Sequence, residues 1–205
     1  MKLYHSPLSP FSRKAVIVAE VLGLSDRITI VPGRGNVMLR DPEFRAMNPA
    51  GQIPVLLTDD GEALFDSPVI CDYLDDLAGG RRVIGSGPER WRNLRDQALS
   101  DTMLDAALQC RYEIGLRPEA NRWADWLEAW RGKIEDTLAA FESRAGELHG
   151  RMDVGVIALF CALDFILARL ADQIPVRTIC PRLAAWHGAF AQLPQVAASA
   201  PARPA

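Results

Sequence analysis

The sequence predicts an α/β domain in the first 77 residues, followed by an all-helical bundle. Up to about residue 77, short β-prone segments alternate with amphipathic ones. The stretch "AGGRRVIGSGPE" then brings a cluster of glycine and charge, and after it the apolar residues keep a helical spacing with no further strand pattern. We therefore expect domains at 1–77 and 88–205, joined by a linker at 78–87.

The predicted order of the first domain is β-α-β-α-β-β-α. "KLYHS" is β-prone, and residues 10–22 carry a helical apolar stripe that ends before Gly23, a typical C-cap. "RITIV" predicts a second strand, and "GRGNVMLRDPEF" at most a short helical turn. "PVLLT" and "EALF" flank "DDG", which predicts a hairpin with Gly61 in the turn, and "SPVICDYLDDL" predicts a closing amphipathic helix.

The second domain is expected to be helical throughout. Helices are predicted from Trp91 to Leu108, from Trp123 to Phe141 and within "PRLAAWHGAFAQLP". The tryptophans of the second helix recur at steps of three and four, which favours core packing between helices, with an aromatic ligand shelf as the alternative. Asp153 can cap the apolar run 154–170, which is too short and too charged to span a membrane and therefore predicts a core helix.

Composition narrows the class of partner. The 205 residues are 49% hydrophobic and 24% charged, as in soluble globular proteins, and 23 basic against 26 acidic residues give a net charge of -3. We therefore expect neither a nucleic-acid nor a membrane partner. The four cysteines lie far apart and without metal-ligand spacing, and no signal-peptide run opens the chain, so we expect no metal and a reducing, cytoplasmic location.

The segment "NPAGQIPVLLTDDGEALFDSPVICDYLDDL" resembles the N-terminal domain of the cytosolic glutathione transferases. In that family Asn-Pro-x-Gly-x-x-Pro precedes the third strand and an acidic-Ser pair opens the third helix; the matching residues are Asn48, Pro49, Gly51, Pro54, Asp66 and Ser67. The resemblance extends over the whole chain and implies a thioredoxin-like first domain, glutathione as cosubstrate, a homodimer and a role in detoxification. "HSPLSPFSRK" resembles bacterial members that carry a serine where others have tyrosine or cysteine.

The resemblance implies a glutathione site formed by Phe11, Gln52, Ile53, Pro54, Asp66 and Ser67. A cis Pro54, as in the family, would leave the main chain of Ile53 free to pair with the tripeptide as an added strand. We expect Ser67 to be the N-cap of the third helix and Pro68 its first residue. A hydroxyl and free N–H groups at a helix start suit the carboxylate of the γ-glutamyl end, and Asp66 suits its ammonium group.

Ser9 is the candidate catalytic residue. Ser9-Pro10 predicts a capped helix start, and a hydroxyl that donates a hydrogen bond to the glutathione thiolate lowers the pKa of that thiol. The thiolate is then the nucleophile, and the serine activates it. Ser6 and Ser12 remain alternatives. By resemblance, the electrophile would lie between the domains against Leu8, Met103, Ala107, Arg111 and Tyr112.

We therefore expect a glutathione S-transferase that joins the glutathione thiolate to a small, hydrophobic electrophile. A glutathione-dependent isomerase, dehalogenase or peroxidase could use the same site. A non-catalytic regulatory or stress protein of the same family is the alternative from another class. Dithiol redox chemistry is disfavoured because "SPFS" stands where thioredoxin relatives carry CxxC.

Overall fold

The computed structural model describes residues 1–33, 38 and 41–200. The elements of the first part follow the predicted order and are β1 (Lys2–His5), α1 (Pro10–Leu22), β2 (Thr29–Pro32), α2 (Pro42–Met47), β3 (Val55–Leu57), β4 (Ala63–Leu64) and α3 (Ser67–Leu77). The helical turn expected within 33–44 corresponds to α2, while residues 34–37 and 39–40 of that segment lie outside the described residues. The predicted β-α-β-α-β-β-α order and the helical second part are confirmed.

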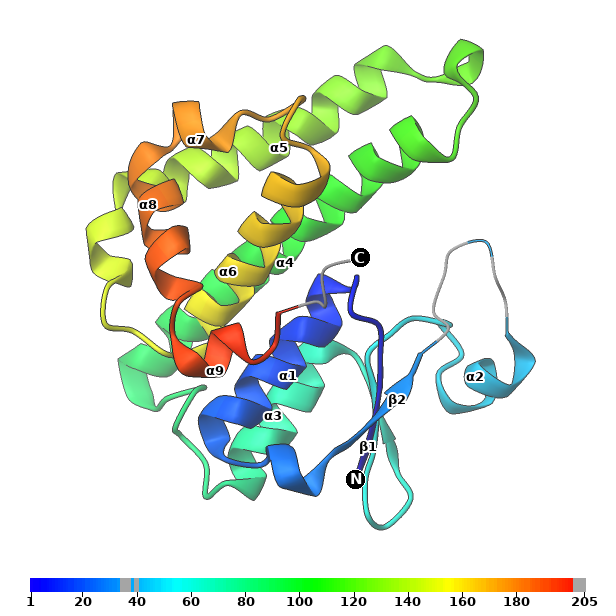
Figure 1. Ribbon diagram of the computed structural model, residues 1–205, viewed down its shortest axis with the longest axis vertical. Coiled ribbons are helices and arrows are strands. Elements are labelled where there is room, and N and C mark those ends of the chain that lie inside the picture. Colours follow the sequence, from blue (N-terminus) through cyan, green and yellow to red (C-terminus); the bar gives the residue numbers. More distant parts are fainter. Residues whose placement is uncertain (34–37, 39–40, 201–205) are drawn as a thin grey trace.

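The sheet has the strand order β2-β1-β3-β4, with β1 parallel to β2 and antiparallel to β3. Gly61 turns the β3–β4 hairpin with φ 90°, as the "DDG" signal predicts. Leu3 in the central strand β1 is buried, as are Ile17 of α1 and Ile70 of α3. These two helices lie together between the sheet and the helical part of the molecule, and α2 lies on the other side of the strands (Figure 1).

The second part consists of α4 (Gly87–Gly115), α5 (Ala124–Ser143), α6 (Val154–Arg169), α7 (Val176–Ile179), α8 (Pro181–Phe190) and α9 (Pro194–Ala197). Helix α6 is buried along most of its length and packs against α4 and α1, as its apolar sequence predicts. Among the residues that the structure describes, no helix combines the length and the apolar character that crossing a membrane requires.

The tryptophan stripe forms only in part the core packing that its spacing favours: Trp130 packs against the core, whereas Trp123 and Trp126 are exposed. Trp123 is 62% exposed and Trp126 is 38% exposed, whereas Ile134, Leu138 and Phe141 further along α5 are buried. The connected ends of α4 and α5 extend beyond α6, so no third helix of the described residues covers the first turns of α5 (Figure 1). The two exposed rings stack on each other instead, with their centroids 5.9 Å apart.

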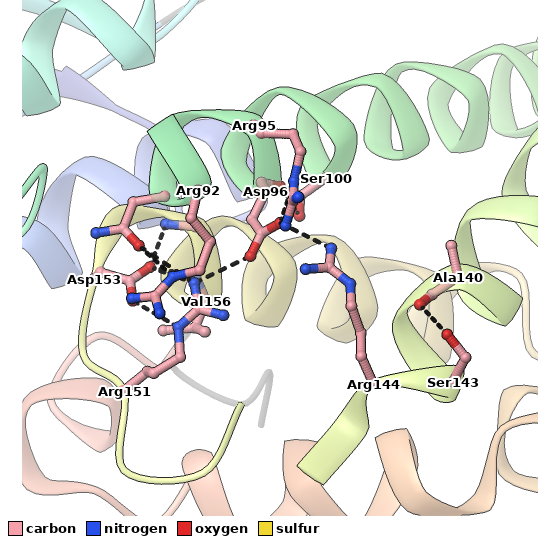
Figure 2. A network of polar contacts seen from close by, with 12 residues as sticks. Arg92, Arg95, Asp96, Ser100, Ala140, Ser143, Arg144, Arg151, Asp153 and Val156 are labelled. Carbon is pink, nitrogen blue, oxygen red and sulfur yellow. Dashed lines mark hydrogen bonds and ion pairs between the residues drawn. The ribbon is translucent and has the colours of Figure 1, made fainter. Parts of the chain in front are cut away.

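A buried ionic network joins the start of α6 to α4 (Figure 2). Asp153 accepts hydrogen bonds from the N–H groups of Gly155 and Val156, which confirms it as the N-cap. Arg151 pairs with both Asp153 and Asp96, and Arg144 adds a second ion pair to Asp96. Burial alone would raise the pKa of Asp96, but the hydrogen bonds from its arginine partners lower that pKa below its ordinary value.

Helix α1 is bound to the helical part by two consecutive basic residues. Arg13 forms a 2.6 Å ion pair with Asp164 of α6, and Lys14 forms a 2.6 Å ion pair with Asp101 of α4. The segment between α3 and α4 is held as well, because the carboxylate of Asp75 accepts the N–H groups of residues 82–84. The start of α1 is therefore held against the helical part, and α3 holds the segment that leads into that part.

Candidate functional site

Ser9 connects β1 to α1 and caps the helix. Its backbone is extended (φ -91°, ψ 114°), and its Oγ accepts a hydrogen bond from the N–H of Ser12 at 3.2 Å. Ser9 is partly exposed, and its hydroxyl proton has no acceptor within the described residues. The hydroxyl can therefore cap α1 through a lone pair and still donate a hydrogen bond to a ligand.

The two alternative serines have different surroundings. Ser12 is completely buried, and its Oγ, like that of Ser67, has no hydrogen-bond partner within the described residues. Ser6 accepts a long hydrogen bond of 3.4 Å from the N–H of Leu8, outside the helix. Phe11 lies in the first turn of α1, partly buried, with the ammonium group of Lys14 5.9 Å from its ring centroid.

The start of α3 carries a buried hydroxyl with no hydrogen-bond partner. Ser67 is 1% exposed, and its Oγ contacts no donor or acceptor within the described residues. The helix begins at Ser67 with Asp66 as its N-cap, one residue earlier than expected, so Ser67 belongs to the first turn. Asp66 is exposed and its side chain makes no capping hydrogen bond. A free hydroxyl, free N–H groups and a free carboxylate therefore lie together.

The loop before β3 presents unpaired main chain. The Ile53–Pro54 peptide is cis, and the N–H and C=O groups of Ile53 form no hydrogen bond within the part of the chain that the structure describes. Asn48 is buried and shapes this loop by donating to the C=O of Gln52 at 2.8 Å and accepting from the N–H of Ala50. The side chain of Gln52 is exposed. An extended peptide could pair with this edge.

Acidic residues of α4 surround the start of α3. Burial raises the pKa of Asp105, and the nearby negative charges of Asp101 and Asp66 raise it further. Burial also raises the pKa of Asp101, although Lys14 beside it acts in the opposite direction. This side of α4 therefore favours a cation near Asp66. Sequence reasoning missed Lys14 and Asp101; the available signal was a lysine within the buried stripe of α1.

The residues predicted for the electrophile pocket differ in side-chain exposure. Leu8 and Arg111 are exposed and Tyr112 is partly exposed, but Met103 and Ala107 are fully buried. Met103 and Ala107 lie on a face of α4 that packs into the core, and their place in the electrophile pocket stays a prediction. The side chain of Arg111 lies along α4 over Gly115, where a Cβ would collide with its guanidinium group.

A small cavity of about 70 Å³ lies directly beside Ser9, between the β1–α1 loop and α6. It is lined by Pro7, Leu8, Ser9, Pro10, Arg13, Cys161, Asp164, Phe165, Ala168 and Arg169. Burial raises the pKa of Cys161 to about 12, so this cysteine is a neutral thiol and a poor nucleophile. A larger open hollow of about 710 Å³ between α5 and α7–α8 contains none of the predicted site residues.

No cluster of three or more potential metal-ligating side chains occurs within the described residues. The arrangement around Ser9, Ile53 and Ser67 instead offers hydrogen-bond donors and acceptors for an extended, zwitterionic peptide. Chemically, it can hold such a peptide and stabilise a negative charge next to Ser9.

Comparison with known proteins agrees with this arrangement. Residues 8–77 match the glutathione S-transferase N-terminal domain. The uncharacterised GST-like protein YibF of Escherichia coli is 32% identical over 171 residues, covering 81% of this chain and 82% of that protein. Maleylacetoacetate isomerase of Pseudomonas aeruginosa is 26% identical over 94% of both chains.

Solved structures give the same result. A glutathione transferase family member from Pseudomonas fluorescens Pf-5, crystallised with bound glutathione, is 35% identical and superposes with a TM-score of 0.93 over 98% of both chains. A second structure of a family member from the same strain contains S-(propanoic acid)-glutathione; it is 34% identical and has a TM-score of 0.88 over 98% of both chains. The fold, the matching domain and the relatives together show that this chain belongs to the glutathione S-transferase family.

Proposed function

We propose that this protein binds glutathione and joins the glutathione sulfur to a small electrophile. The observation that carries the proposal is the buried hydroxyl of Ser67, which has no hydrogen-bond partner in the first turn of α3 and lies next to the free carboxylate of Asp66. The γ-glutamyl end of glutathione carries a carboxylate and an ammonium group on one carbon. Ser67 and the N–H groups of α3 suit the carboxylate, and Asp66 suits the ammonium.

The rest of the tripeptide would run along the loop before β3. The unpaired main chain of Ile53 can form strand-like hydrogen bonds with it, and Gln52 can add a side-chain contact. In this proposal the cysteine lies at Ser9, whose free hydroxyl proton and position at the start of α1 both favour a thiolate. The thiolate attacks the electrophile, forming the new sulfur–carbon bond while the leaving group departs with its electron pair.

The relatives favour a transferase and keep one alternative reaction open. The neighbour that contains S-(propanoic acid)-glutathione holds a sulfur joined to a small organic group, as in the product of a conjugation. The similarity to a maleylacetoacetate isomerase over 94% of the chain supports a glutathione-dependent isomerase as the second candidate. A dehalogenase or a peroxidase would use the same glutathione site for a different reaction. A regulatory protein would bind glutathione at this site without turning over a substrate.

We also propose a cytoplasmic homodimer with domains at 1–77 and 88–205. The apolar side chains of Phe65, Val69 and Trp91 are exposed around the start of α3 and the first turns of α4, and a second copy could cover them. Sedimentation that gives a monomer at micromolar concentration would refute the dimer.

The proposal is tested by calorimetric titration of glutathione into the protein and into its Ser67→Ala variant. A buried hydrogen bond to a charged group contributes about 1.5–3 kcal/mol, so the variant should bind roughly 10- to 100-fold more weakly. Ser86→Ala is the matched control, because Ser86 precedes α4 and its exposed side chain makes no capping hydrogen bond. No saturable binding by the unmodified protein at millimolar glutathione would refute the proposal.

Turnover separates the remaining candidates. A transferase should conjugate a model aryl halide or another electrophile, whereas an isomerase should convert a cis-alkene diacid without consuming glutathione. Binding of glutathione without turnover of any member of a broad electrophile panel would instead favour the regulatory protein.

A further inference from the structure

Two different elements of the fold form the walls of the cavity beside Ser9. The β1–α1 loop forms one wall and carries Ser9, and the last two turns of α6 form the other and carry Arg169. A reacting carbon must approach the sulfur to about 3–3.5 Å, and in the proposed function that sulfur lies at Ser9. The substituents of an electrophile at this position can therefore extend into the space between the loop and α6.

Three charged residues line this cavity, and two of them neutralise each other. Arg13 forms a 2.6 Å ion pair with Asp164, and Arg13 also donates to Ser199 Oγ. Asp164 has a second partner, since His187 Nε2 lies 3.2 Å from its other oxygen. Burial alone would raise the pKa of Asp164, but His187 and Arg13 lower this pKa below its ordinary value. The carboxylate is therefore charged at neutral pH.

Arg169 supplies the remaining charge. It stands at the end of α6 and is exposed, and its side chain forms no hydrogen bond or ion pair with any residue that the structure describes. The cavity wall therefore carries one uncompensated positive charge. The simplest structural explanation is that a basic residue in the last turn of a helix complements the helix dipole. That role requires no position at a cavity, and Arg169 lines the cavity next to Ser9.

We propose that the electrophile carries a carboxylate, and that Arg169 binds this carboxylate while the glutathione thiolate attacks. The inference rests on the proposed function and names the class of its second substrate. A guanidinium group can donate two parallel hydrogen bonds to a carboxylate, which orients the ligand as well as binding it. The cavity volume of about 70 Å³ restricts the part of the electrophile beside Ser9 to a group of only a few atoms.

Chloroacetate and chloroacetamide are the matched probes. They have nearly the same shape and differ by one negative charge, and in both the sulfur–carbon bond forms as chloride leaves with the bonding electrons. When the kcat/KM for each probe is divided by the rate constant of its uncatalysed reaction with glutathione, the value for chloroacetate should be the larger of the two. Arg169→Gln should lower this preference about tenfold, the effect of one charged hydrogen-bonded contact, whereas Arg169→Lys should retain most of it.

Arg177→Gln is the charge-matched control, since Arg177 lies on α7, is exposed and does not line the cavity. It should leave the preference unchanged. An equal preference in the unmodified protein and in Arg169→Gln would overturn the assignment of Arg169. A preference for chloroacetamide in the unmodified protein and in every variant would refute the proposal that the electrophile carries a carboxylate.

A binding measurement decides the matter even if neither probe is turned over. S-carboxymethylglutathione should bind about tenfold more tightly than S-(carbamoylmethyl)glutathione in calorimetry, and Arg169→Gln should abolish this difference. Unmodified glutathione should bind the Arg169→Gln variant as tightly as the original protein. Absence of any glutathione binding would refute the proposed function, whereas glutathione binding with no preference for the carboxymethyl derivative would refute this inference alone.

Discussion

Ser9 has two separable roles in the proposed mechanism, and two substitutions distinguish them. Its Oγ caps α1 by accepting the N–H of Ser12, and its hydroxyl proton is free to donate to a thiolate. Ser9→Ala removes both interactions. Ser9→Gly removes the hydroxyl but keeps most of the capping preference, because glycine is itself a good N-cap residue.

The structure gives a magnitude for each role. Loss of a serine cap to alanine costs about 1 kcal/mol and loss to glycine a few tenths, so Ser9→Ala should lower Tm by about 2–4 °C and Ser9→Gly by much less. A hydrogen bond to a charged group contributes about 1.5–3 kcal/mol, so in both variants the pKa of the bound thiol should rise by about 1–2 units. Below that pKa, kcat/KM should fall roughly 10- to 100-fold in both.

Three measurements test this prediction: thermal unfolding, the pH dependence of kcat/KM with an aryl halide, and the ultraviolet absorbance of the thiolate in the glutathione complex. Ser6→Ala is the control, because the Oγ of Ser6 accepts only a 3.4 Å hydrogen bond from the N–H of Leu8 and Ser6 lies outside the helix. If Ser9→Gly kept full activity while Ser9→Ala lost it, the hydroxyl would act only as a cap. If Ser6→Ala raised the pKa of the bound thiol instead, the serine would be misassigned.

Three further predictions concern stability. Lys14→Met leaves the carboxylate of Asp101 buried and unpaired, so chemical denaturation should show a loss of about 3–5 kcal/mol in the free energy of unfolding. Adding Asp101→Leu should recover most of this loss, and additive effects of the two substitutions would contradict the pairing. The pKa of Asp96 is below its ordinary value of 3.8, so the charged carboxylate stabilises the fold above pH 3.8 and this stabilisation is lost on further acidification. Asp96→Asn should therefore flatten the acidic part of the curve of unfolding free energy against pH. A Cβ at Gly155 would lie 2.7 Å from a neighbouring side chain, so Gly155→Ala should destabilise the protein by about 1–3 kcal/mol in thermal unfolding. A Cβ at Gly188 would meet nothing within 4 Å, so Gly188→Ala should be neutral or stabilising.

The features that the sequence predicts well are those determined by local chemistry. The hairpin at Gly61, the C-cap at Gly23 and the N-cap at Asp153 depend on residues within a few positions of one another, and all three are present. The cis peptide before Pro54 agrees with the family resemblance. The acidic-Ser pair marks the start of α3 correctly, with the helix boundary shifted by one residue.

The features that the sequence does not predict arise where the buried face of a helix depends on its neighbours. The spacing of Trp123 and Trp126 predicts an apolar stripe correctly, but it does not show that the end of the α4–α5 pair extends beyond the helices that would cover it. Met103 and Ala107 lie one turn apart on a helix that packs against both α5 and α6. A helix with neighbours on two sides has a broad buried face, so the pattern alone does not show which residues remain for a cleft.

The ionic contacts between distant segments were beyond prediction for a related reason. Arg13 and Lys14 are adjacent in the sequence, yet they pair with Asp164 and Asp101 on two different helices of the second part. Successive residues of a helix point about 100° apart, so two neighbouring bases can reach α6 and α4 only if α1 faces both of these helices. Both pairs lie within about one and a half turns of Ser9. The position of the candidate thiol-activating hydroxyl is therefore set by the helical part as well as by the sheet from which it emerges.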